Sequence, residues 1–363
     1  MPTRPPRVGL GNFPTPVQRL EKLERELGGP RLYIKRDDMT DLAMGGNKVR
    51  QLDYILVDAV KEKADVLVTT CGVQSNWSRQ MVGAAIKLGM DAVLVLRTLQ
   101  FKHKPDAYDG NILLDYIMGA KIRVIQMGTG EDPAPYLAQE AEKLRKKGRR
   151  PHVLGLDALM SPRGALGYVE AMRELSAQLR RAKVKLDAIV VPGGGPTHAG
   201  VLVGARAYGM ESTRVIGVPV SPALRREKVE SALKIAKDAA ALIHSEMALT
   251  SDDVLIENEY AGERYGLPTR RSLEAIRLLA SREAILLDPV YTSKVMSGLI
   301  DLARSGEFKK DDNVCFLHTG GVPALFAYRS FFQPPSLRKP ISFLVGQPDQ
   351  KGSRRSHLLA KSI

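Results

Sequence analysis

Cysteine is scarce in this sequence: Cys71 and Cys315 are the only two among 363 residues, and they lie far apart. Two distant cysteines exclude a disulfide scaffold and a zinc site built from cysteines, and they favour a reducing, cytoplasmic compartment. The 6 histidines show no metal-ligand spacing, which argues against a zinc enzyme. No stretch approaches the roughly 20 unbroken apolar residues of a membrane span, and no secretory signal is visible at the start. We therefore expect neither a metal site nor a membrane segment.

Acidic residues are outnumbered by basic ones, because 54 Lys and Arg stand against 40 Asp and Glu, a formal net charge of +14. Part of the excess lies in 143–150, where a helical pattern ends, and part in the tail 336–363. Cations are favoured at the carboxyl end of a helix, so we interpret the first run as a solvated helix end. No zinc finger or RNP motif occurs, which disfavours a nucleic-acid partner. An anionic ligand is another use for the positive charge.

Short apolar runs alternate with longer amphipathic ones, a pattern typical of the α/β class. The runs predicted as strands are 32–36, 65–72, 91–97, 121–128, 152–156, 187–195, 215–220 and 313–321. The segments predicted as helices are 76–89, 133–147, 164–181, 224–244, 270–281 and 292–304. Repeated strand–helix units predict mainly parallel sheets with helices on both faces. Such sheets bind ligands at the carboxyl ends of their strands.

Lys48 is the first candidate catalytic residue. It follows Gly45 and Gly46, which permit an unusual backbone path, and it precedes a helical pattern over 49–60. The amino end of a helix carries partial positive charge, so a lysine there is electrostatically disfavoured. Desolvation would lower its pKa and favour the neutral amine, which is the nucleophilic form. For this segment alone, an ordinary exposed lysine is the alternative.

A glycine-rich turn follows the strand predicted at 187–195. Gly193, Gly194 and Gly195 precede Thr197 and a helix of small residues. Backbone N–H groups of such a turn, together with a helix amino end, can cradle a phosphate. The turn is neither GxGxxG nor a P-loop, so it is weak evidence by itself.

Other turns from strand to helix carry polar side chains. Ser75 and Asn76 open a helix whose free N–H groups suit a carboxylate, although an ordinary N-cap is the alternative. Tyr291 and Thr319 lie in 285–303 and 316–328, each interpreted as a strand end followed by a helix, and are expected in the same cleft. Core packing and helix capping are their alternatives. His318 is expected to be a buried structural histidine.

Together these segments resemble the family of D-cysteine desulfhydrase and 1-aminocyclopropane-1-carboxylate deaminase, from about Phe13 to Tyr328. The motifs that carry the resemblance, in family order, are KRDD, GGNK, QSN, GNILLD, GALGY, THAG, LLDPVYT and HTGGVPAL. The resemblance implies the tryptophan synthase β-like fold type II of pyridoxal-phosphate enzymes, with two open twisted sheets, and a homodimer. The implied domains are a large one of 1–51 plus 161–335, a small one of 52–160, and the basic tail 336–363.

The resemblance also implies roles for individual residues. Lys48 matches the lysine that holds pyridoxal phosphate as a Schiff base and can abstract the Cα proton of an amino acid. Asn76 matches a contact to the phenolic oxygen of the cofactor, and Ser75 a contact to the substrate carboxylate. The other matches are the phosphate cup (Gly193, Gly194, Gly195, Thr197), two pocket tyrosines (Tyr265, Tyr291) and the position facing the pyridine nitrogen (Thr319).

Two positions bear on the reaction. Ring-opening deaminases of this family carry a glutamate just after the tyrosine and an apolar residue before the GG pair, where this chain has Thr292 and Thr319. A hydroxyl favours a neutral pyridine ring, which suffices to expel a β-leaving group. We therefore predict α,β-elimination of D-cysteine or a similar amino acid to pyruvate, ammonia and sulfide. The alternatives are ring-opening deamination, expulsion of sulfite or chloride, β-replacement, and a non-catalytic relative.

Three positions depart from the family pattern. Gln51 stands where a lysine near the phosphate is usual, and Pro196 lacks an N–H that could be donated to the phosphate. Trp77 stands where desulfhydrases usually have histidine, and we expect it to narrow the pocket or to stack on a planar substrate.

Overall fold

The computed structural model describes residues 3–98, 109–127 and 131–332. The chain divides into two compact units, Met1–Tyr328 and Arg329–Ile363. The first unit contains both β-sheets. All strands of one sheet fall within 52–160 and all strands of the other lie outside this range, as the predicted domains require, but a division of the first unit into two domains stays a prediction.

The larger sheet has six strands in the order β1-β2-β10-β7-β8-β9. Its strands are β1 (Val17–Arg19), β2 (Arg31–Arg36), β7 (Ala188–Pro192), β8 (Arg214–Val218), β9 (Leu255–Ile256) and β10 (Asn313–His318). Only β1 and β2 pair antiparallel, and every other pair is parallel. Buried β-branched and aliphatic residues fill β7 and β10 because helices cover both faces of the sheet.

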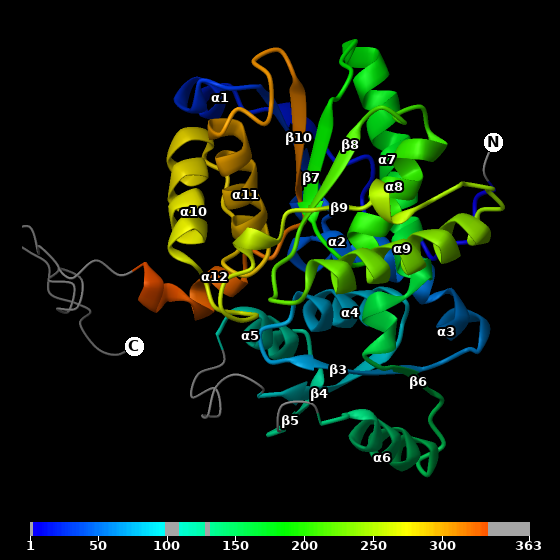
Figure 1. The fold of residues 1–363 in the computed structure, drawn as a ribbon. Helices are drawn as coiled ribbons and strands as arrows, with labels where there is room; N and C mark the ends of the chain where they lie inside the picture. Colours follow the sequence, from blue (N-terminus) through cyan, green and yellow to red (C-terminus); the bar gives the residue numbers. More distant parts are fainter. Residues whose placement is uncertain (1–2, 99–108, 128–130, 333–363) are drawn as a thin grey trace, which may run out of the picture. The chain divides into compact units, whose positions relative to one another are not determined.

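The smaller sheet has four parallel strands in the order β5-β4-β3-β6. They are β3 (Val66–Gly72), β4 (Asp91–Arg97), β5 (Lys121–Ile125) and β6 (Pro151–Leu154). One face packs its Leu67, Leu94 and Leu96 in a core with α4 (Asn76–Lys87), and the other packs Val68 and Val93 against α6 (Ala134–Arg145). Figure 1 shows these two helices on opposite sides of the sheet.

Helices also cover both faces of the larger sheet (Figure 1). On one side lie α7 (Pro162–Ala182) and α8 (Pro196–Ala207), and on the other α10 (Arg270–Glu283) and α11 (Thr292–Arg304). The remaining helices are α1 (Glu21–Leu27), α2 (Asn47–Ile55), α3 (Val57–Lys61), α5 (Gly110–Ile117), α9 (Arg225–Leu242) and α12 (Ala324–Ala327). Within the described ranges no helix is both long and apolar enough to cross a membrane.

The predicted α/β architecture of mainly parallel sheets is confirmed, since the eight runs named above as strands and the six segments named as helices are all present. The sequence pattern missed β1 and β9, which have 3 and 2 residues and are too short for a detectable period. The helix expected over 49–60 is two helices, α2 and α3.

The strand end expected at the start of 285–303 is absent, so this part of the prediction is wrong, and the cause is physical. The carboxylate of Asp288 accepts hydrogen bonds from the backbone N–H groups of Val290, Tyr291 and Thr292, at 2.9, 2.9 and 2.7 Å. These groups lie at the amino end of α11, so the segment is a capping turn and is not available to a sheet.

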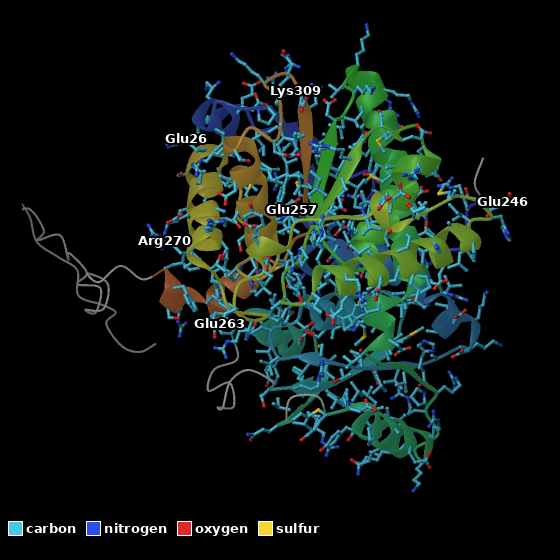
Figure 2. All side chains as sticks on the ribbon, viewed as in Figure 1. Glu26, Glu246, Glu257, Glu263, Arg270 and Lys309 are labelled. Carbon is cyan, nitrogen blue, oxygen red and sulfur yellow. The ribbon has the colours of Figure 1, made fainter. Side chains whose placement is uncertain are left out.

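The basic run is a solvated helix end, as predicted. Lys143 pairs with Glu140 on the surface of α6, and Arg149 pairs with Asp65 just beyond the helix. In Figure 2, other exposed charged side chains, such as Glu26 of α1, stand on the outside of the ribbon.

Candidate active site

A cavity of about 450 Å³ opens at the carboxyl ends of β3, β4, β7 and β10, where the two sheets face each other. Nine of the ten predicted site residues line it. They are Lys48, Ser75, Asn76, Gly193, Gly195, Thr197, Tyr265, Tyr291 and Thr319. Residues from six separate segments of the chain therefore meet at one place, as expected for ligand sites of parallel sheets.

Lys48 lies in the first turn of α2, and its amine is within the cavity wall. The preceding Gly45 and Gly46 have φ angles of 66° and 127°, which side chains rarely adopt, and this turn aims the helix start at the cavity. Burial lowers the pKa of the Lys48 amine to about 8. The expected poised amine is thus present, and its neutral form is accessible near physiological pH.

Gln51 joins the amine to the glycine-rich turn. The Lys48 amine donates to Gln51 Oε1 at 3.0 Å, and Gln51 Nε2 donates to Thr197 Oγ1 at 3.2 Å. Asn47 Nδ2 donates to the same hydroxyl oxygen at 3.2 Å. Lys48 and the start of α8 therefore border the same cavity along one hydrogen-bonded path.

The glycine turn presents the amino end of α8 to the cavity. Gly195 is the N-cap, Pro196 is the first helical residue, and no side chain caps this end. A proline at this position is favoured, because the N–H that it lacks is one that a helix leaves unpaired anyway. The N–H groups of Thr197 and His198 and the Thr197 hydroxyl are the polar groups of this helix end, which suits an anion.

The three glycines of the turn differ in their contacts. The N–H of Gly193 donates to the carbonyl of Val218 at 2.9 Å, and the N–H of Gly194 is directed to His198 Nδ1 at 3.5 Å. Burial lowers the pKa of His198 to about 4, so this ring is neutral and can accept. Gly193 and Gly195 line the cavity, whereas a Cβ added at Gly194 would lie 2.7 Å from the Lys228 side chain. Gly194 was predicted to donate its N–H to the phosphate, but this N–H is directed to the ring of His198.

Ser75 and Asn76 begin α4 at the cavity. The Ser75 hydroxyl accepts from the N–H of Trp77 at 3.1 Å, so Ser75 is an N-cap as well as a lining residue. Asn76 Oδ1 accepts from Asn111 at 3.0 Å, which fixes the orientation of its amide. Trp77 is only 1% exposed and its indole donates to Thr69 at 3.0 Å. Trp77 also lines the cavity, so it narrows the pocket, which is one of its two expected roles, while stacking on a substrate stays a prediction.

Two tyrosines form another part of the wall. Tyr265 and Tyr291 touch through their hydroxyls, and their rings meet edge to face with centroids 5.9 Å apart. Burial raises the pKa of Tyr265 to about 12 and that of Tyr291 well above its usual value, so both are neutral. His318 is buried between two backbone partners, as predicted, with Nε2 bonded to the carbonyl of Leu286 at 2.9 Å.

The two threonines used to predict the reaction lie in different places. Thr319 lines the cavity, and its carbonyl accepts from the N–H of Asn47 at 3.0 Å. Thr292 is fully buried, and its hydroxyl donates to Asp288 at 2.7 Å. Thr292 is thus engaged with its own helix cap, and among the two only Thr319 faces the ligand space.

Sequence reasoning missed the polar residues Arg97 and Asn47 of the wall, and also Tyr328, whose hydroxyl donates to the carbonyl of Gly266 at 2.8 Å. Gln51, which the sequence placed near the phosphate, lines the cavity too. Arg97 had a usable signal, since it is the charged last residue of an apolar strand. None of the described residues that line the cavity is acidic.

Comparison with known proteins identifies the class. Residues 8–320 match the family of pyridoxal-phosphate dependent enzymes, and the chain belongs to this family. A 1-aminocyclopropane-1-carboxylate deaminase of Burkholderia multivorans is 41% identical over 334 residues, which are 90% of this chain and 97% of that protein. A 1-aminocyclopropane-1-carboxylate deaminase of Bradyrhizobium diazoefficiens is 40% identical, covering 90% of this chain and 98% of its own length.

A solved structure agrees with this assignment. The crystal structure of an ACC deaminase homologue has a TM-score of 0.78 and 38% identity, covering 90% of this chain and 95% of that one. The protein has the tryptophan synthase β-like fold and is a pyridoxal-phosphate-dependent enzyme. The resemblance drawn from the sequence motifs is confirmed.

The residues present fit this cofactor. An aldehyde needs a neutral amine, and Lys48 supplies one of lowered pKa. A phosphate needs N–H and hydroxyl donors at a helix amino end, and the start of α8 supplies them without a capping side chain. Open space at Gly195, where an added Cβ would meet no atom within 4 Å, leaves room beside these donors. Lys48 would hold the aldehyde carbon, and Thr197 and its neighbours the phosphate.

Proposed function

We propose that this enzyme is a lyase that releases ammonia from a small amino acid. The observation that carries the proposal is the amine of Lys48 bordering the same cavity as the uncapped amino end of α8. When bound there, pyridoxal phosphate supplies an electron sink for the bond changes at the substrate Cα. The chain's own groups then bind and orient the amino acid and move its protons.

The proposed roles follow from position. Ser75 and the N–H groups at the start of α4 bind the substrate carboxylate, and Asn76, held by Asn111, contacts the cofactor ring. Lys48 would hold the cofactor aldehyde, and its neutral amine is placed to accept the Cα proton of the substrate. The neutral Tyr265–Tyr291 pair lies in the wall with its hydroxyls linked, placed to pass a proton to or from the substrate.

Ring-opening deamination of 1-aminocyclopropane-1-carboxylate is the first candidate reaction. The names of the relatives favour ring opening over β-elimination. These relatives are 41% and 40% identical to this chain, and the similarity extends over 90% of it. Ring opening is also compatible with a threonine at position 292. The hydroxyl of Thr292 is bonded to Asp288 at the start of its helix, so this side chain says little about the protonation of the cofactor ring. The products would be 2-oxobutyrate and ammonia.

β-Elimination of D-cysteine or a similar amino acid is the second candidate. The observation that favours it is the hydroxyl of Thr319 at the cavity, together with the lack of a carboxylate among the described lining residues. A wall without an acid favours an unprotonated pyridine nitrogen, which suits expulsion of a β-group. Its products would be pyruvate, ammonia and sulfide.

One product assay separates the candidates. Purified enzyme loaded with pyridoxal phosphate is given 1-aminocyclopropane-1-carboxylate, D-cysteine, L-cysteine and β-chloro-D-alanine, and the 2-oxo acids are identified by chromatography. 2-Oxobutyrate from the cyclopropane alone supports ring opening, and pyruvate from the β-substituted amino acids supports elimination. Lys48→Ala is the control. Release of no 2-oxo acid from any of these amino acids would contradict the proposed lyase.

A further inference from the structure

Arg97 is a cation of the cavity wall that the proposed chemistry leaves unused. It is the last residue of β4, and its Cα is paired in register with Gly72 of β3. Adjacent strands lie about 4.8 Å apart, so the backbone of Arg97 lies beside the turn that leads to Ser75. The N–H of Ser75 bonds back to the carbonyl of Gly72 at 3.1 Å, which holds that turn against the strand end. Arg97 is therefore next to the proposed carboxylate site.

No described residue balances the charge of Arg97. Its Nε is buried and has no hydrogen-bond partner in the described part of the chain, and no carboxylate there is among the groups that act on its charge. The ionisable groups that act on it are Cys71 and Tyr265. Burial raises the pKa of the Cys71 thiol to about 11, so both neighbours are neutral. A guanidinium stays charged under these conditions, and an unpaired one in a desolvated place is costly.

Other anions of the site have their own donors. The cofactor phosphate is assigned to the start of α8, and the α-carboxylate of the substrate to Ser75 and the start of α4. Lys48 is the other cation that lines the cavity, and it is committed to the cofactor aldehyde. A second negative group on the substrate would supply the charge that Arg97 lacks, and a planar guanidinium binds carboxylate, sulfonate and phosphate groups well.

We propose that Arg97 is a specificity-determining residue that binds an anionic group on the substrate side chain. Beside the two candidate substrates above, the enzyme then also takes amino acids with a second acidic group on Cβ, and this inference rests on the proposed lyase. If that group is a sulfonate, the Cα proton is lost and the Cβ–S bond breaks with its electron pair leaving on sulfite. Water then completes the release of ammonia and pyruvate, so no external oxidant or reductant is needed.

Binding is the first test, with alanine and aspartate as ligands because neither has a good leaving group. Calorimetry on the pyridoxal-phosphate-loaded enzyme, with both enantiomers, should show aspartate binding about tenfold or more tighter than alanine of the same hand. Arg97→Gln should remove this preference and leave alanine binding unchanged, while Arg97→Lys keeps part of it. Arg226→Gln, on the exposed face of α9, is the matched control and should keep it all.

Turnover separates the kinds of anion. Cysteate, aspartate and O-phosphoserine carry a sulfonate, a carboxylate and a phosphate, and release of pyruvate with sulfite or phosphate identifies the group that is expelled. Equal affinity of the unmodified enzyme for aspartate and alanine would overturn the inference, as would an equal loss of both ligands in Arg97→Gln. The visible absorbance of bound pyridoxal phosphate reports the proposed lyase site independently, so the two failures are distinguishable.

Discussion

The amine of Lys48 lies inside the cavity, where burial lowers its pKa to about 8 from the ordinary lysine value of 10.5. Only the neutral amine attacks an aldehyde. We predict that the rate at which the apoprotein takes up pyridoxal phosphate rises with pH to about 8 and then levels off. Stopped-flow absorbance measures this rate, with Nα-acetyllysine as the control whose rate keeps rising towards pH 10. A protein rate that tracks the control would show that the amine is not desolvated.

At the scale of elements, the turn before α2 depends on a close approach between the backbones of Gly46 and Gly320. Gly320, at the end of β10, has a φ of 83°, and a Cβ there would lie 2.7 Å from the α-carbon of Gly46. We predict that Gly320→Ala separates β10 from α2, weakens uptake of pyridoxal phosphate by at least about tenfold and destabilises the fold by about 2 kcal/mol or more. Gly89→Ala is the matched control, since Gly89 has a φ of 71° but open space around it, and should cost only about 1 kcal/mol.

Cofactor titration and urea unfolding on both variants check this prediction. Equal effects of the two substitutions would mean that the glycines matter for their φ angles alone, and not for the contact between β10 and α2.

A buried ionic cluster fixes α2 to the larger sheet. Arg50 of α2 donates to Asp37 at 2.8 Å and to Glu174 of α7 at 3.2 Å, and Lys35 of β2 also pairs with Glu174. Arg50→Met leaves two carboxylates buried without this partner, and we predict a loss of about 3–5 kcal/mol in the free energy of unfolding. Urea denaturation measures it. Removal of an exposed pair by Arg270→Gln should cost under about 1 kcal/mol, and a similar loss in both variants would refute the role of the cluster.

The same elements show what a single sequence can predict. The strands β3, β4, β7 and β10 were predictable because each is a continuous buried apolar run followed by a glycine or polar turn. The turn at Asp288 was not, because three hydrogen bonds to a carboxylate leave no periodic signal. Arg97 was missed as a site residue, and the partner of Gln51 could not be predicted, because both depend on neighbours distant in the sequence, Tyr265 and Thr197.

At the scale of the whole molecule, the resemblance implies a homodimer, and we propose one. Ile117 of α5 and Phe326 of α12 lie on helices that pack together and are 67% and 62% exposed. Exposed apolar groups that cluster often mark an interface. We predict sedimentation as a dimer, and a shift towards monomer in Ile117→Asp, while Leu242→Asp, on the separate helix α9, leaves the dimer intact. A monomer at all concentrations of the unmodified protein would contradict the proposal.

The whole account depends on Lys48 as the point of attachment for the cofactor. The most direct test is to incubate the purified protein with pyridoxal phosphate, reduce it with borohydride, digest it and locate the pyridoxyl group by mass spectrometry. The predicted result is a modification on the peptide that carries Lys48, with loss of the visible absorbance, and neither feature in Lys48→Ala. A pyridoxyl group on another lysine, or none on a protein shown to be folded, would contradict it.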